Sequence, residues 1–85
     1  MRKEYSIIFY YSRFCGSCKG YKDVVEKLSK ALDIEVIKKE IGDYKPLHDI
    51  EGIPCVILER NGVELYRSVG NLGFQQLYKD IKDYV

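Results

Sequence analysis

The chain has 85 residues, which predicts one domain over residues 1–85 with a small core that buries about 60–65 % of the unfolded surface. Its formal net charge of +1 comes from 14 basic and 13 acidic residues mixed along the sequence, which excludes the charge pattern of a nucleic-acid-binding or anionic-membrane-binding protein. No apolar run is long enough to span a bilayer, and no secretory signal pattern follows the basic N-terminus. We therefore expect a cytoplasmic protein, and a monomer.

The first half of the chain predicts a strand, a helix and a second strand. Tyr5–Tyr11 is almost continuously apolar, as in a central strand that is buried on both faces. From Ser17 to Leu32, apolar residues recur at the spacing of one helix face, and Ile34–Ile37 predicts a second strand parallel to the first. Gly20 lies inside the helix at a cost of about 1 kcal/mol relative to alanine, so either the first turn is loose or another segment packs closely there.

The second half predicts a β-hairpin followed by a helix. Residues 42–49 look like a loop with one helical turn after Pro46, and Cys55–Leu58 is an apolar strand. Asn61-Gly62 separates this strand from Val63–Val69 and is a strong signal for a two-residue hairpin turn. Phe74–Val85 has helical spacing.

The order of these elements, β-α-β-β-β-α, defines an α/β protein. It predicts a four-stranded mixed sheet, flanked by two helices that cover its apolar faces. Pro54 stands at the entrance of the third strand, where a residue without a backbone N–H is tolerated.

Cys15-Gly16-Ser17-Cys18 is the motif that carries chemistry. Two cysteines at this spacing can close a small disulfide ring. They stand at the predicted N-terminus of a helix, where unpaired N–H groups and the positive end of the helix dipole favour a thiolate. The position after the first strand is also where open α/β sheets place their ligand sites. The motif therefore indicates a dithiol redox site.

A zinc site is the main alternative, because half of one has the same spacing. Cys15 and Cys18 together with His48 and Cys55 would form a Cys₃His set, although the spacing between the last two matches no familiar ligand pattern. We expect His48 on the surface and Cys55 packed as a small apolar residue in a central strand. A third redox role for Cys55 is the alternative for that residue.

The second half of the chain resembles a thioredoxin in Gly52-Ile53-Pro54, Val56-Ile57-Leu58, Asn61-Gly62 and Val69-Gly70. With the cysteine motif and Lys19, the resemblance covers nearly the whole chain. The leading strand and helix of the family are missing, so the chain resembles the short members of glutaredoxin size with a minimal thioredoxin fold. The Cys-Pro-x-Cys motif, Val-Pro pair and Gly-Gly loop of a glutaredoxin are absent, which favours thioredoxin.

The resemblance implies a thiol–disulfide oxidoreductase that reduces protein disulfides through Cys15 and Cys18. It implies no bound cofactor beyond the redox-active disulfide between these cysteines, and a cis Pro54 against the sulfurs. The substrate groove that it implies is lined by Phe14, Gly16, Ser17, Gly52, Ile53, Pro54, Val69 and Gly70.

The implied partners are disulfide-containing proteins, and either a flavin thioredoxin reductase or glutathione as the electron donor. Two alternatives remain open from the sequence. One is a glutathione-dependent reductase of glutaredoxin type, and the other is a thioredoxin-fold binding module with zinc-bound or structural cysteines.

Three departures from the family pattern lie near the site. Phe14 replaces the usual tryptophan, and Ser17 replaces a proline, which adds a backbone N–H able to stabilise the Cys15 thiolate. Phe9 stands where thioredoxins carry a buried acid, so we expect no built-in base for Cys18. The neighbouring Arg13 and Lys19 are expected on the solvated surface.

Overall fold

The computed structural model describes residues 2–41 and 50–85, and it has the predicted order of elements. The helical turn predicted after Pro46 and the surface position predicted for His48 lie outside these residues. The described residues form two helices and four strands: β1 (Tyr5–Tyr11), α1 (Gly16–Leu32), β2 (Glu35–Glu40), β3 (Cys55–Arg60), β4 (Val63–Val69) and α2 (Phe74–Lys82). The minimal thioredoxin fold expected from the sequence is confirmed.

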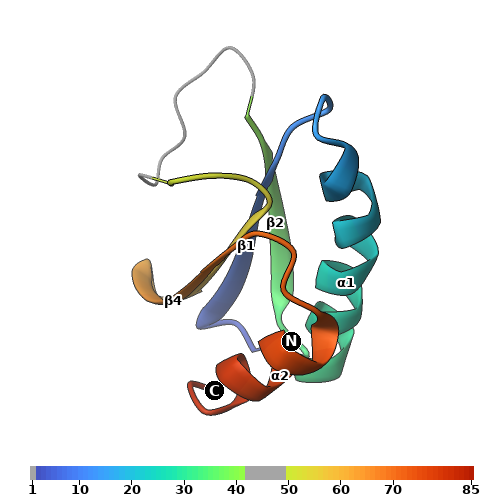
Figure 1. Cartoon of the computed structure of the whole chain (residues 1–85). Helices are drawn as coiled ribbons and strands as arrows, with labels where there is room; N and C mark the ends of the chain where they lie inside the picture. The colour runs from blue at the N-terminus through green and yellow to red at the C-terminus, as the bar shows by residue number, and fades with distance from the viewer. Residues whose placement is uncertain (1, 42–49) are drawn as a thin grey trace.

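The four strands form one mixed sheet in the order β2-β1-β3-β4 (Figure 1). β1 pairs in parallel with β2, as the crossover through α1 requires, and antiparallel with β3. β4 then pairs antiparallel with β3. β1 is therefore hydrogen-bonded along both edges, and it leads directly into the segment that carries the cysteines.

Both faces of β1 are buried, as its apolar sequence predicts. Successive side chains of a strand point to opposite faces, so Ile7 and Phe9 pack with the residues of α1 and α2, whereas Ile8 and Tyr10 belong to a second cluster. All four are at most 5 % exposed. Both helices lie on the same side of the sheet (Figure 1). The opposite face holds the smaller cluster with Cys55 and Ile57.

Helix α1 starts one residue earlier than predicted, because Cys15 caps it. The Cys15 side chain accepts a hydrogen bond from the backbone N–H of Cys18, which satisfies one of the unpaired donors of the first turn. At the other end, Asp33 takes the left-handed conformation with φ 57° and donates its N–H to the Ser29 carbonyl. No helix in the described ranges is long and apolar enough to cross a membrane. The buried face of α1 consists of Cys18, Tyr21, Val25, Leu28 and Leu32.

Three further elements have boundaries other than those predicted, β2 and β3 for a tertiary reason and α2 for a local one. β2 runs over Glu35–Glu40 rather than Ile34–Ile37, because its backbone pairs with β1 as far as Glu40, regardless of its charged side chains. β3 continues for two residues beyond Leu58 to reach the hairpin turn. α2 ends at Lys82 rather than Val85, where the Tyr84 N–H donates to the Ile81 carbonyl in a final tight turn.

The hairpin turn predicted at Asn61-Gly62 is confirmed. Asn61 has φ 51° and Gly62 has φ 84°, and positive φ at both central residues is the signature of a type I′ turn. This turn twists in the same sense as the strands, so it sets the pairing of β3 with β4. The pairing in turn brings the end of β4 beside the start of β3.

Replacement of Gly20 by alanine should stabilise the protein. A Cβ built at Gly20 has no atom within 4 Å, so no segment packs closely against this helix position, and the glycine only adds conformational freedom to the unfolded chain. We expect Gly20→Ala to raise the free energy of unfolding of the oxidised protein by about 0.5–1 kcal/mol in urea titrations.

Gly62→Ala is the matched control for this prediction. A Cβ at Gly62 also meets nothing within 4 Å, but φ there is +84°, a conformation that strains any L side chain. We expect this variant to lose about 1 kcal/mol. A loss of stability in Gly20→Ala would show that the first turns of α1 need the glycine.

Candidate active site

Cys15 and Cys18 form a disulfide at the start of α1, with their Cα atoms 5.3 Å apart. Cys15 is the N-cap residue and is partly exposed, whereas Cys18 faces the core and is 2 % exposed. The two sulfurs therefore differ in access. Cys15 is the one that a large substrate can reach, and Cys18 is shielded behind it.

Two polar groups contact the Cys15 sulfur. The Cys18 backbone N–H donates to it at 3.3 Å, and the Ser17 Oγ lies 3.4 Å away. Both groups, together with the positive end of the helix dipole, stabilise a negative charge on this sulfur once the disulfide is reduced. The sequence predicted a contribution from the Ser17 backbone. The hydroxyl contact was missed, although a serine in the first turn of a helix is the signal that indicates it.

The segment between β1 and α1 is a tight turn that exposes an aromatic side chain. The Cys15 N–H donates to the Ser12 carbonyl at 3.0 Å, and the Phe14 N–H donates to the Ser12 hydroxyl at 3.2 Å. Phe14 is 90 % exposed next to the disulfide. A large apolar side chain in water at this position is available for contact with another molecule.

The second group of predicted site residues comes together from two loops. The Ile53–Pro54 bond is cis, as the resemblance implied, and the Pro54 carbonyl accepts a 2.9 Å hydrogen bond from the Gly70 N–H. A Cβ on Gly52 would lie 3.4 Å from a methyl group of Val69, so the two loops touch at a point that suits a glycine. Gly70 itself has φ +100°.

Both groups of site residues lie at the same end of the sheet. Cys55, the first residue of β3, pairs with Tyr10 near the end of β1 and with Val69 at the end of β4. The loop before β3 and the loop after β4 are therefore neighbours of the turn that leads to Cys15. Among the described residues, Phe14 and Val69 are large apolar side chains that this end presents to water, at 90 % and 43 % exposure.

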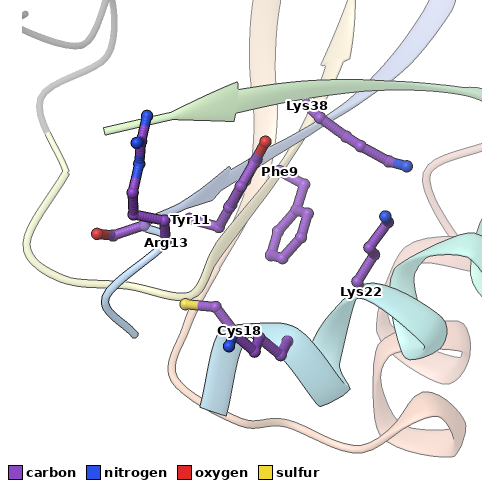
Figure 2. Close-up of a pocket in the computed structure, with 8 residues that line it drawn as sticks. Phe9, Tyr11, Arg13, Cys18, Lys22 and Lys38 are labelled. Carbon is purple, nitrogen blue, oxygen red and sulfur yellow. The ribbon is translucent and has the colours of Figure 1, made fainter. Parts of the chain in front are cut away.

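A cavity of about 340 Å³ opens beside Cys18 (Figure 2). None of the described residues that line it is acidic. Phe9, 1 % exposed, occupies its wall in place of the acid that the family pattern would put there. The expectation that Cys18 has no built-in base stays a prediction, because residues 42–49 lie outside the described part of the chain. We name this pocket the Cys18 cavity. The residues that line it are Phe9, Tyr11, Ser12, Arg13, Cys18, Lys19, Lys22 and Lys38.

Arg13 is on the surface, as predicted, and forms an ion pair that joins the active-site turn to β2. Its Nε donates to a Glu40 carboxylate oxygen at 2.8 Å, and its side chain is 72 % exposed. The hydrogen bond from Arg13 lowers the pKa of Glu40 below its usual value. Lys19, on the first turn of α1, is exposed as well.

Cys55 is a buried free thiol in the second core cluster, as the sequence predicted. Its side chain is 0 % exposed, and burial raises the pKa of the thiol, so it stays protonated and poorly nucleophilic near neutral pH. Within residues 2–41 and 50–85, no group of three or more His, Cys, Asp or Glu side chains is placed to hold a metal ion. His48, the fourth member of the alternative zinc set, lies outside these residues.

Comparison with known proteins agrees with this geometry. Residues 1–83 match the thioredoxin family model. The chain is 35 % identical over 69 residues to mitochondrial thioredoxin-2 of Schizosaccharomyces pombe, a match that covers 76 % of this chain and 52 % of that protein. It is 28 % identical over 72 residues to thioredoxin-1 of Saccharomyces cerevisiae, covering 75 % of this chain and 66 % of that protein.

Among solved structures, a thioredoxin from Halobacterium salinarum NRC-1 aligns with a TM-score of 0.85 at 25 % identity, covering 95 % of this chain and 74 % of that chain. The chain belongs to the thioredoxin family. The matched regions amount to about half to two thirds of the length of the two yeast relatives.

Removal of the Ser17 hydroxyl should destabilise the Cys15 thiolate. We expect Ser17→Ala to raise the Cys15 pKa by about half a unit and to make the reduction potential more negative by about 10–20 mV, because the reduced form loses a hydrogen-bond donor. The pKa is measured from thiolate absorbance against pH, and the potential in glutathione redox buffers.

Ser17→Thr is the control, because it keeps the hydroxyl in the same position. Its pKa and potential should stay near those of the original protein. An unchanged Cys15 pKa in Ser17→Ala would mean that the backbone N–H of Cys18 and the helix dipole stabilise the thiolate without help from the hydroxyl.

Proposed function

We propose that this protein is a thiol–disulfide oxidoreductase that reduces disulfide bonds in other proteins. The observation that carries the proposal is the Cys15–Cys18 disulfide at the N-cap of α1, with the Cys18 N–H 3.3 Å from the Cys15 sulfur. This geometry gives one accessible sulfur with a stabilised thiolate and one shielded sulfur next to it. Membership of the thioredoxin family supports the same activity.

In the proposed reaction, the Cys15 thiolate attacks one sulfur of a substrate disulfide. A bond forms between Cys15 and that sulfur, and the other substrate sulfur leaves as a thiolate. Cys18 then loses its proton and attacks the Cys15 sulfur, which releases the second substrate thiolate and restores the Cys15–Cys18 disulfide. Two electrons pass from the protein to the substrate, and the two substrate thiolates take up protons.

In the proposed reaction, the proton of Cys18 passes to water and not to a buried carboxylate. Phe9 occupies the wall beside Cys18, and the described lining residues of the Cys18 cavity carry four basic groups and no acid. We propose that water in this cavity accepts the proton and that the basic groups favour the resulting thiolate. The second step of the reaction then accelerates as pH rises.

The proposed substrate groove lies between the exposed Phe14 and the loops at Ile53 and Val69. An extended peptide can pair with the backbone next to Pro54 in the manner of strand addition, while the apolar side chains contact its residues on either side of the disulfide. Because backbone contacts dominate, we expect broad acceptance of substrate sequences. We further propose that the protein acts as a monomer in a reducing compartment such as the cytoplasm, where an external thiol or a reductase renews the dithiol.

Substitution of the three cysteines tests this function. Cys15→Ser should reduce insulin disulfide reduction in a dithiothreitol-coupled assay to background, because the attacking thiolate is gone. Cys18→Ser should accumulate a stable mixed disulfide between Cys15 and the substrate, visible by mass spectrometry under non-reducing conditions.

Cys55→Ser is the control, with activity expected to stay within about two-fold, and zinc content is measured in every sample. Full activity in Cys15→Ser, or stoichiometric zinc that blocks the thiols of the original protein, would refute the proposed function.

A further inference from the structure

The Cys18 cavity is positively charged, although the protein as a whole is nearly neutral. Four of its lining residues are basic, from the active-site turn, from α1 and from β2: Arg13, Lys19, Lys22 and Lys38. The formal net charge of the whole chain is only +1. A volume of about 340 Å³ is within the size range of small-molecule sites. The charge is therefore concentrated where a small ligand fits, in a cavity that Cys18 also lines.

Only part of this charge is neutralised by neighbouring carboxylates. Arg13 pairs with Glu40 and Lys38 pairs with Glu26, each at 2.8 Å. Lys19 and Lys22 take part in no ion pair within the part of the chain that the structure describes. Among the described residues, two of the four cations have no carboxylate within ion-pair distance, and Glu26, the partner of Lys38, also feels the charge of Lys22.

The arrangement of the lysines favours a bound anion. Lys22 on α1 and Lys38 on β2 extend toward one another across one side of the cavity (Figure 2). Glu26 pairs with Lys38 and also feels the charge of Lys22, so it removes part of the repulsion between the two lysines, and an anion bound in the cavity would remove more. The floor of the cavity is apolar, since the rings of Phe9 and Tyr11 stack with their centroids 5.4 Å apart. The site thus suits a molecule with both an aliphatic part and an anionic group.

We propose that the Cys18 cavity binds the anionic part of a low-molecular-weight thiol, or of its disulfide, and that this molecule exchanges with the Cys15–Cys18 pair. This proposal rests on the proposed oxidoreductase function and names a further substrate for the same cysteines. The ligands that fit this proposal share a carboxylate or phosphate group attached to an alkyl thiol. Cys18 lines the cavity and is bonded to Cys15, so a thiol anchored there has its own sulfur close to the disulfide.

The exchange balances as two thiol–disulfide steps. The thiolate of one ligand attacks the Cys15 sulfur, the Cys15–Cys18 bond breaks, and Cys18 leaves as a thiolate that takes up a proton. A second ligand thiolate attacks the sulfur of the first ligand, and Cys15 leaves as a thiolate. Two ligand thiols lose two electrons to form one disulfide, and the protein disulfide gains them. The same steps in reverse reduce the ligand disulfide.

The test compares small disulfides of different charge as oxidants of the reduced protein. Glutathione disulfide carries carboxylates, coenzyme A disulfide carries phosphates, hydroxyethyl disulfide is neutral and cystamine is positive. Rate constants at low ionic strength are measured by acid quench and mass spectrometry. Each is divided by the rate constant of the same disulfide with free dithiothreitol, which removes differences in intrinsic reactivity.

We expect the normalised rate of at least one anionic disulfide to exceed that of hydroxyethyl disulfide about ten-fold, with cystamine slowest. Lys19→Gln and Lys22→Gln should each reduce the ratio of anionic to neutral rates about three-fold, the size of one partly exposed charge interaction. Lys30→Gln is the matched control, because it removes the same charge from α1 outside the cavity lining. Whether glutathione or coenzyme A disulfide gives the larger rate distinguishes a carboxylate from a phosphate ligand.

Equal normalised rates for anionic and neutral disulfides would overturn the inference and leave the oxidoreductase function intact. The inference would also fail if Lys30→Gln reduced the ratio as much as Lys22→Gln, since the effect would then come from net charge alone. If none of the disulfides oxidised Cys15 and Cys18, the proposed function would fail and this inference with it.

Discussion

The double pairing of β1 is the constraint on which the rest of the structure depends. This strand is hydrogen-bonded to β2 on one edge and to β3 on the other, and its side chains are buried on both faces. The strand is therefore fixed by backbone hydrogen bonds on both edges and by side-chain packing on both faces. The turn at Ser12 then carries the chain directly to Cys15, so the disulfide follows a strand that is paired on both edges.

The site uses backbone and helix geometry rather than a cofactor to prepare a sulfur for reaction. Cys15 is both the cap of α1 and the exposed member of the disulfide, so the same N–H that stabilises the helix end also favours the thiolate. Cys18 is shielded one turn along the helix. Cys55 is a contrasting case, because burial raises the pKa of its thiol and keeps it an unreactive core residue.

The surroundings of Cys18 depart from the thioredoxin pattern at Phe9. An aromatic ring at Phe9 makes the wall of the cavity neutral, and the basic groups around it come from three elements. An acid at that position would have cancelled part of this charge. The residue at position 9 therefore bears on both proposals, the route of the Cys18 proton and the binding of an anion in the cavity.

Much of the fold and the reactive pair could be predicted from local patterns in the sequence. The continuous apolar run of β1, the helical spacing of α1, the Asn61-Gly62 turn and the cysteine spacing each reflect interactions between residues close in the chain. Only tertiary structure decided the rest. It placed both helices on one face, extended β2 to Glu40 through pairing with β1, and brought Gly52 against Val69. It also gathered Arg13, Lys22 and Lys38 around Cys18. These outcomes depend on contacts between residues far apart in sequence. The local pattern around a residue does not show which distant residues it will contact.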